Sequence, residues 1–276
     1  MAFQPCTYVS VQMKEQTLPI WLDDYIFNNL GARFCRSNAD MTVIDWTPEK
    51  ILNYLGTYFP RSYTESYCIF KHHFQHTEIF SLEDAISVLD FGCGTGGEII
   101  GLATAISEER PNVKRLIVKA IDGNQYALNR FDDVKDEFNK RNYLQIVSNP
   151  SAITIDDFYD LSILDDILSE NYDIVMSFKA VCEFVTKQQF KEKNAYEYLA
   201  RFMLPKLSDM GIMLLVDVTT KNNVAQEWLP NLMDKGLHDA GASVIERNQT
   251  NNETFVVNHS QQRHDISKIA WRLIKK

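Results

Sequence analysis

The residues with the clearest capacity for chemistry lie in one glycine-rich stretch, Asp90-Phe91-Gly92-Cys93-Gly94-Thr95-Gly96. The residues from Val88 to Asp90 are typical of the end of a buried strand, and Glu98-Ile99-Ile100 can open a helix. Between them the glycines allow a tight turn, in which bare backbone N–H groups and a helix N-terminus can face a ligand. The stretch therefore predicts a small-molecule site where a strand passes into a helix.

The spacing of this stretch resembles the first motif of the class I S-adenosylmethionine (SAM) dependent methyltransferases. The pattern acidic-x-Gly-x-Gly-x-Gly is complete as Asp90, Gly92, Gly94 and Gly96. In that family the glycine turn cradles the amino-acid part of SAM, and the acidic residue orders the loop around it. The resemblance implies an enzyme, a SAM-dependent methyltransferase, with SAM as cofactor and with these four residues and Cys93 in contact with it.

The glycines also leave a second interpretation open. Gly92, Gly94 and Gly97 satisfy the G-x-G-x-x-G fingerprint of dinucleotide-binding proteins, as in a nucleotide-dependent oxidoreductase. Two features favour SAM. Asp90 lies inside the strand, where a methyltransferase carries its acidic residue. In addition, roughly eighty residues precede the motif, whereas a dinucleotide fold usually places its fingerprint in its first βα unit.

The chain after residue 81 alternates between predicted strands and helices, which indicates a mainly parallel sheet. Strands are expected at 87–90, 115–122, 152–155, 173–177 and 211–217, helices at 97–107, 124–143, 186–204 and 223–240, and final β segments at 243–247, 254–258 and 267–274. Terminal β segments without a helix between them match a family whose seventh strand returns antiparallel. We expect an α/β fold with a Rossmann-like, seven-stranded methyltransferase sheet and helices on both faces.

The ends of the predicted strands supply further candidates, because open α/β sheets bind ligands at the carboxyl ends of their strands. Asp122-Gly123 ends the second strand, and the resemblance implies that a carboxylate here accepts hydrogen bonds from a ribose diol; a helix-capping Asp is the alternative. After the third strand, Asp157, which we prefer to Asp156, could accept from an adenine amine, and Phe158 could pack on the ring. An exposed acidic loop is the alternative for this pair.

The fourth strand ends in Ser177-Phe178-Lys179-Ala180, a segment that lies beside the methyl donor in the family, so Ser177 is a candidate cofactor contact. Enzymes that methylate exocyclic amines of bases or glutamine often carry Asn-Pro-Pro-Tyr here, and its absence disfavours that chemistry. Glu183 follows among apolar neighbours and is a candidate catalytic base or substrate-binding group. A position facing solvent is the alternative for Glu183 and also for Lys179.

Residues 1–80 are rich in aromatic side chains and are expected to form an N-terminal helical cap over a SAM-binding domain of residues 81–276. Thr47-Pro48-Glu49 is a strong helix start, and Pro60 is expected to end that helix. Ser62-Tyr63-Thr64-Glu65 fits a capping box that opens a second helix. A cap attached here can reach the carboxyl ends of the strands.

This cap supplies three more candidates. We expect Arg61, Tyr63 or both to line the donor pocket, and His73 to lie near the acceptor as a second candidate catalytic residue. The alternatives are a core position for Tyr63, a surface charge for Arg61 and a surface cluster for the histidines. His72 and His76 have a spacing that can bind a metal, but no third ligand is evident, so no metal site is predicted.

Charge and composition narrow the class of partner. The formal net charge is −9 with dispersed basic residues, which disfavours a nucleic-acid substrate without excluding one. The five cysteines lack metal-ligand or redox spacing, no apolar run has the length of a membrane span, and no secretion signal is visible. These features favour a cytoplasmic protein without a membrane partner.

The expected function is methyl transfer from SAM to a small molecule or a peptide. An RNA methyltransferase is the alternative, because Tyr58-Phe59-Pro60-Arg61-Ser62-Tyr63 and Cys182-Glu183-Phe184 faintly resemble the ribosomal small-subunit methyltransferase-like family of mitochondria and bacteria. This chain lacks that family's cysteine-rich metal-binding signature. A non-catalytic SAM-fold partner subunit is a third possibility, which the intact glycine motif disfavours. The oligomeric state cannot be read from the sequence.

Overall fold

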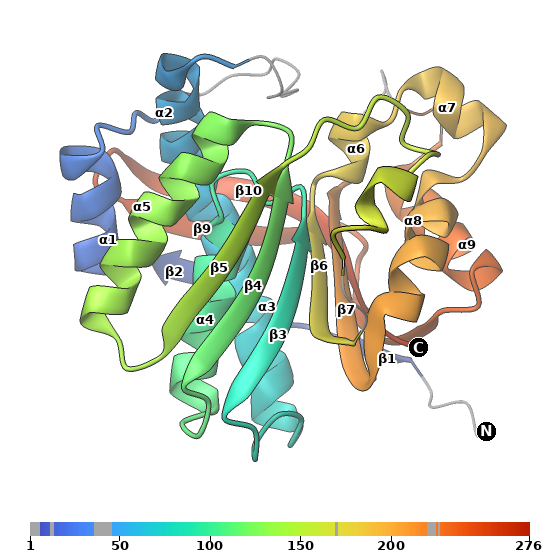
Figure 1. The fold of residues 1–276 in the computed structure, drawn as a ribbon, viewed down its shortest axis with the longest axis horizontal. Helices are drawn as coiled ribbons and strands as arrows, with labels where there is room; N and C mark the ends of the chain where they lie inside the picture. Colours follow the sequence, from blue (N-terminus) through green and yellow to red (C-terminus); the bar gives the residue numbers. More distant parts are fainter. Residues whose placement is uncertain (1–5, 12–13, 36–45, 169–170, 220–224, 226) are drawn as a thin grey trace.

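One large mixed sheet forms the centre of the molecule (Figure 1). The structure is a computed structural model, and it describes residues 6–11, 14–35, 46–168, 171–219, 225 and 227–276. The described part contains a ten-stranded sheet whose main path is β1-β8-β10-β7-β6-β3-β4-β5. The strands of the parallel region are β3 (Ala85–Phe91), β4 (Arg115–Asp122), β5 (Gln145–Ala152), β6 (Tyr172–Phe178) and β7 (Leu207–Val218).

The strand order confirms the expected methyltransferase sheet. β3 lies in the middle and pairs in parallel with β4 on one side and with β6 on the other. β8 (Ser243–Asn248) and β10 (Gln262–Lys275) complete the seven strands, and β10 runs antiparallel to β7 and to β8. The strand order reverses between β3 and β6, so the carboxyl end of β3 faces the position where such sheets bind ligands.

Three strands extend the sheet beyond the expected seven. β9 (Glu253–His259) pairs with the first half of β10, β2 (Glu15–Thr17) pairs with β9, and β1 (Thr7–Val9) pairs with β8. The third strand runs from Gln145 to Ala152, so the prediction of a strand at 152–155 was wrong except at its first residue. Its polar, proline-containing sequence gives a weak strand signal, but β5 is an edge strand, where Pro150 is tolerated.

Helices cover both faces of the sheet, as expected. One hydrophobic cluster joins the sheet to α3 (Phe59–His76), α4 (Gly97–Glu109) and α5 (Gln125–Arg141). The other cluster joins it to α6 (Val181–Phe184), α7 (Lys187–Glu192), α8 (Ala195–Met203) and α9 (Leu229–Asp239), which Figure 1 shows grouped beyond β6 and β7. The remaining helical segments are α1 (Ile20–Asp24), η1 (Tyr25–Asn29), α2 (Pro48–Thr57), η2 (Ser162–Leu164) and η3 (Leu204–Lys206).

Two predicted helices differ from the observed ones. The helix expected over 186–204 is divided into α7 and α8, because the side chain of Asn194 caps α8 by accepting from Tyr196 N at 3.0 Å. The helix expected from residue 223 appears as α9, and the expected start lies outside the described residues.

In the region before the sheet, the start of α2 agrees with the prediction, whereas the start of α3 does not. The Thr47 side chain caps α2. Pro60, however, lies in the first turn of α3, where its missing N–H leaves no hydrogen bond unmade, so it begins a helix rather than ending one. The predicted capping box is therefore interior to α3. A Cβ at Gly101 would overlap the carbonyl oxygen of Tyr63, so glycine lets α3 pack closely along α4. The division of the chain at residue 80 stays a prediction.

Candidate functional site

The glycine turn, residues 92–96, lies at the carboxyl end of β3 and leads directly into α4. Gly92, Gly94 and Gly96 have φ values of 77°, 49° and 76°, which side chains other than glycine rarely adopt. The N–H groups of Gly92 and Cys93 donate to the carbonyl of Ile121 at 2.9 Å and 3.0 Å, which fixes the start of the turn against β4. The strand–turn–helix unit predicted from the sequence is therefore present at the centre of the sheet.

The three glycines of the turn have different neighbours. A Cβ at Gly96 would overlap the Phe131 ring, and one at Gly92 would lie 2.6 Å from the Ala180 Cβ. These two glycines therefore allow close packing within the protein. A Cβ at Gly94 would lie 2.7 Å from the hydroxyl of Tyr54, so Gly94 faces an aromatic side chain of α2. Residues 93–96 of the turn are buried, and Gly94 lies beneath that side chain.

Asp90 is the most unusual residue beside the turn. Its side chain is 0 % exposed, and neither carboxylate oxygen has a hydrogen-bond partner among the described residues. Burial, and then the charges of Glu98 and Asp122, hold the pKa of Asp90 well above its usual range. A buried carboxylate without a partner is costly, and a cation bound nearby would relieve that cost.

Asp122 braces the glycine turn. One carboxylate oxygen accepts from Gly94 N and the other from Asn124 N, each at 2.8 Å. Burial raises the pKa of Asp122 to about 6, although hydrogen bonds from backbone N–H groups, including that of Gly123, oppose the rise. The Asp122 side chain thus holds both the loop after β3 and the loop after β4. Because each oxygen has a second lone pair, the role of Asp122 toward a ribose stays a prediction.

Two buried carboxyl groups that the sequence did not reveal, those of Glu98 and Glu65, lie beside these residues. Glu98 is in the first turn of α4, and burial raises its pKa to about 8. Glu65 on α3 is fully buried and pairs with Lys179 Nζ at 2.8 Å. Lys179 itself follows β6 with a φ of 56°. Glu65 was assigned to the predicted capping box, and an acidic residue in a first helical turn is ordinary, so no local signal marks either carboxylate as buried.

Aromatic side chains cover the glycine turn. Trp46 meets Tyr54 edge to face at 5.6 Å between ring centroids, and Tyr54 stacks on Tyr58 at 5.1 Å. The Asn124 amide donates to the Trp46 carbonyl at 3.3 Å, which ties this aromatic cover to the loop after β4. Burial, followed by the charges of Glu98 and Asp122, raises the pKa of Tyr54 well above its usual value. The region before the sheet therefore does reach the turn, through α2.

The two α3 residues expected in the pocket lie elsewhere. Tyr63 is 3 % exposed and stacks on Tyr67 at 6.0 Å in the core between α3 and the sheet. Arg61 makes a two-pronged ion pair with Asp265 of β10, at 2.6 Å and 2.8 Å. The expectation that they line the donor pocket is corrected: Tyr63 is a core residue, and Arg61 joins α3 to β10.

The loop after β5 also departs from the expectation. Phe158 is 1 % exposed and packs against Tyr159 and Tyr198 in the cluster formed with α6 to α9. Phe158 is therefore a core ring rather than a surface on which a ligand could pack. Asp157 is exposed and accepts hydrogen bonds from Tyr159 N and the Gln189 amide, so it organises its own loop.

The end of β6 does lie beside the glycine turn. Ser177 is buried, and its hydroxyl has no partner among the described residues. Phe184 of α6 packs on Phe91 at 5.6 Å, and its ring would lie 3.2 Å from a Cβ at Gly92. The charge of Glu183 acts on Tyr54, which covers Gly94. Ser177 and Glu183 therefore remain candidates, together with the turn and the two buried Asp residues.

His73 lies at the other end of α3. Phe59, at the beginning of this helix, packs against Gly97 beside the turn. His73 comes fourteen residues later, which separates the two positions by roughly 21 Å along the helix. Its Nδ1 lies 2.7 Å from Glu246 Oε1 of β8. The expectation that His73 lies on the acceptor side of the donor pocket is wrong.

Two properties of the described residues bear on ligand class. No three His, Cys, Asp or Glu side chains among them are placed to hold a metal ion together. None of the described helices has the length and apolar character needed to cross a membrane.

Comparison with known proteins identifies the fold. No family model matches the sequence, and no curated protein matches it. The structure is similar to the trans-methyltransferase CalH in complex with SAH, with a TM-score of 0.50 and 11 % identity over 83 % of this chain and 62 % of that chain. The structure is also similar to mitomycin 7-O-methyltransferase MmcR, with a TM-score of 0.47 and 10 % identity over 85 % of this chain and 60 % of that chain. A third similar structure is human N-acetylserotonin methyltransferase in complex with SAM, with a TM-score of 0.47 and 13 % identity over 91 % of this chain and 62 % of that chain. This chain spans less than two thirds of each. It has the methyltransferase fold.

Proposed function

We propose that this protein transfers the methyl group of SAM to a small-molecule or peptide acceptor. The observation that carries the proposal is Asp90, a fully buried carboxylate without a partner among the described residues, at the end of the central strand of a methyltransferase fold. SAM carries a positive charge on its sulfonium and another on its amine. A cation of this kind would stabilise the ionised form of Asp90 and of Glu98 nearby.

The residues of the site fit this ligand. At Gly94 the turn would present bare backbone to the amino-acid part of SAM, in the space that the Tyr54 hydroxyl occupies in this structure. Asp122 holds the turn and can share its carboxylate with a ribose hydroxyl. The aromatic cover of Trp46, Tyr54 and Tyr58 closes the site from the side of α2. Movement of the Tyr54 ring would open the space above Gly94.

The chemistry requires positioning more than acid–base catalysis. Bound SAM supplies a methyl group already activated by its sulfonium. The protein therefore has to orient the acceptor in line with that methyl group and keep water out. Glu183, in α6 just after β6, can take the proton of an acceptor that must lose it early. The buried pair of Glu65 and Lys179 fixes the backbone beside it.

Three observations support a small molecule or peptide over RNA as the acceptor. The chain has a net charge of −9, which opposes binding to a phosphate backbone. Arg61, in the segment that resembles an RNA methyltransferase family, is already paired with Asp265. The aromatic cover offers an apolar wall that suits a small organic acceptor.

Calorimetry on the whole chain with SAM, S-adenosylhomocysteine and NAD, each alone, tests the cofactor. We expect micromolar binding of SAM and S-adenosylhomocysteine and none of NAD. Asp90→Asn keeps the shape and removes the charge, so it should weaken SAM binding about tenfold or more. The matched control is Asp84→Asn, an exposed Asp just before β3. A response to NAD alone would overturn the proposal. Binding of SAM without methyl transfer to any member of a panel of small-molecule and peptide acceptors would instead indicate a non-catalytic subunit.

A further inference from the structure

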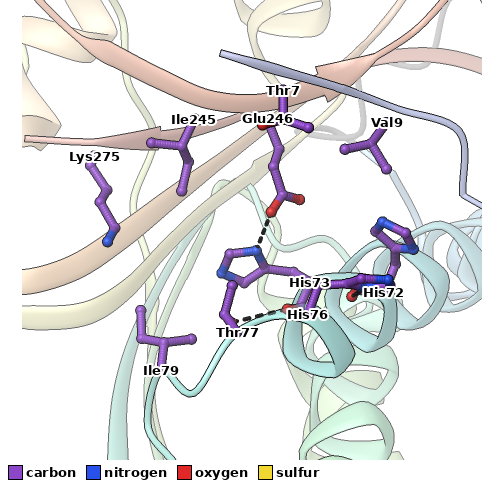
Figure 2. Close-up of a pocket in the computed structure, with 10 residues that line it drawn as sticks. All are labelled: Thr7, Val9, His72, His73, His76, Thr77, Ile79, Ile245, Glu246 and Lys275. Carbon is purple, nitrogen blue, oxygen red and sulfur yellow. Dashed lines mark hydrogen bonds and ion pairs between the residues drawn. The ribbon is translucent and has the colours of Figure 1, made fainter. Parts of the chain in front are cut away.

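A second group of titratable side chains lies at the far end of α3 (Figure 2). It lines a hollow of about 430 Å³ between α3, β1, β8 and the last residues of β10. Its titratable members are His72, His73, His76, Glu246 and Lys275, and Thr7 and Thr77 are the other polar residues of the lining. The hollow is at the end of α3 opposite to the glycine turn, so the proposed methyl transfer does not use it. We call it the histidine hollow.

His73 has one ring nitrogen engaged and one without a partner. Nδ1 lies 2.7 Å from Glu246 Oε1, while Nε2 is buried and has no hydrogen-bond partner among the described residues. The ring is 2 % exposed, and Figure 2 shows it turned toward the side of the hollow where Lys275 lies. A buried polar atom left without a partner costs about 1–3 kcal/mol.

Lys275 supplies an unbalanced positive charge in the same hollow. Its side chain is half-buried and extends toward His73 in Figure 2. Within the described ranges it forms no ion pair or hydrogen bond, whereas the next residue, Lys276, donates to the carbonyl of Leu207. A partly buried ammonium group without an ion-pair partner is suited to a ligand that brings an anion.

A metal ion is not the ligand that these residues fit. No three His, Cys, Asp or Glu side chains in the described part of the chain are placed to share one. The rings of His72 and His76 instead contact each other, with centroids 4.3 Å apart. His76 Nδ1 donates to the carbonyl of His72 at 2.7 Å, so this pair forms a rim of the hollow.

A phosphate dianion fits no better. The hollow lies at the C-terminus of α3, where the helix dipole is negative, and Glu246 adds a further negative charge. Among the described lining residues, the cationic donors that face the space are the Lys275 ammonium group and the His73 ring when its Nε2 carries a proton, while the Thr77 hydroxyl already donates to the carbonyl of His73. Two donors on two walls suit the two oxygens of a carboxylate. The aliphatic side chains of Val9, Ile79 and Ile245 complete the lining and suit an apolar body.

We propose that the histidine hollow is a second ligand site, which binds a small organic carboxylate. One carboxylate oxygen accepts from the Lys275 ammonium group. The other accepts from Nε2–H of His73, while Nδ1–H of the same ring stays on Glu246. The apolar body of the ligand lies against the three aliphatic side chains. The site is independent of methyl transfer.

The test uses butyrate and benzoate as probes, with calorimetry for affinity and long-range ¹H–¹⁵N NMR spectra for the histidine ring nitrogens. We expect saturable binding with a Kd on the order of 1 mM or tighter and a shift of the His73 Nε2 signal on binding. Lys275→Met should weaken binding tenfold or more. Lys268→Met removes an exposed lysine from the same strand and should change nothing.

Four results would overturn the proposal: no saturable binding of either carboxylate, equal binding of butylamine, tighter binding of inorganic phosphate, or unchanged affinity in Lys275→Met. Because Lys275 is only half-buried, this variant should fold, and its far-UV circular dichroism and its SAM affinity check that it does. His73→Gln provides a second variant, in which the amide can still bond Glu246 but loses the ring donor.

Discussion

The glycine turn and the histidine hollow lie at opposite ends of α3, and both contain buried polar groups that the fold leaves without partners. At the glycine turn these are acidic: Asp90 has no partner among the described residues, and burial raises the pKa of Glu98 to about 8. In the hollow they are Nε2 of His73 and Oε2 of Glu246, and the half-buried ammonium group of Lys275 lies in the same lining. The ligands that we propose differ in charge, a cation at the first site and a carboxylate held by Lys275 and His73 at the second.

The two regions also differ in how the chain builds them. The glycine turn comes from one continuous strand–turn–helix unit, which also carries Asp90 and Glu98, while its aromatic cover and Asp122 come from other elements. The histidine hollow is made by α3, β1, β8 and the end of β10, which are far apart in the sequence. A local unit carries a recognisable motif, while a site assembled from distant elements has none.

The largest expected effect concerns the buried ion pair beside the glycine turn. Lys179→Met leaves Glu65 charged, fully buried and unpaired, so the free energy of unfolding should fall by about 3 kcal/mol. Denaturant unfolding at neutral pH measures it. The double variant Glu65→Gln with Lys179→Met should recover most of the loss. Lys206→Met, which breaks a pair with the exposed Asp165, should cost less than about 1 kcal/mol. A loss as small in Lys179→Met would contradict the burial argued for Glu65.

The next effect concerns the backbone of the turn. Gly94→Val places a branched side chain against the Tyr54 hydroxyl, at a φ of 49°. SAM affinity should fall about a hundredfold or more, equivalent to about 2.7 kcal/mol, and the fold should also lose stability. Gly241→Val is the matched control, because Gly241 has a φ of 75° with nothing near a Cβ. It should show the backbone strain without loss of SAM binding. Retained SAM affinity in a folded Gly94→Val variant would place the ligand elsewhere.

The acidic character of the first site predicts a pH dependence. The pKa of Glu98 is raised by burial to about 8 in the folded protein, above its value in the unfolded chain. The folded state therefore holds the proton over a range where the unfolded state has lost it, and stability falls as the pH rises from about 4.5 to 8. Glu98→Gln should be more stable than the parent by about 1–3 kcal/mol at about pH 8.5, with little difference near pH 4.

Thermal and denaturant unfolding across this pH range measure the Glu98 effect. Glu83→Gln, an exposed residue before β3, is the control and should leave the profile unchanged. Since a bound cation lowers the cost of the charged form, SAM should bind with release of protons near neutral pH, which calorimetry in buffers of different ionisation enthalpy detects. A parallel pH profile for the parent and for Glu98→Gln would show that Glu98 is not the group that titrates.

The smallest effect tests whether the two regions are separate. His73→Gln removes a residue roughly 21 Å along α3 from the turn. SAM affinity should change less than twofold. The free energy of unfolding should change by only about 1 kcal/mol, because the glutamine amide can replace the hydrogen bond to Glu246. Titration of the variant with SAM and then with benzoate measures both sites. A large loss of SAM affinity with intact folding would show coupling between them.

Much of the fold follows from local sequence signals. The glycine pattern predicts a strand, a turn and a helix, because only glycine adopts three positive φ values so close together. The apolar run of β4 is predicted with the observed bounds, 115–122. The Thr47 cap of α2 is also predicted correctly. These signals depend on neighbouring residues alone, so they can be read before any tertiary contact is known.

Tertiary structure determines which neighbours the residues of a predicted helix contact. Pro60 is compatible with the end of one helix or with the start of another, and packing against α4 selects the start. Glu65, Tyr63 and His73 lie on one helix with similar sequence surroundings, yet one pairs with Lys179, one is core and one lines a distant hollow. Burial and pairing arise from contacts between elements far apart in the chain. Periodicity therefore predicts that a helix forms, while the neighbours that the fold brings to each face determine the function of its residues.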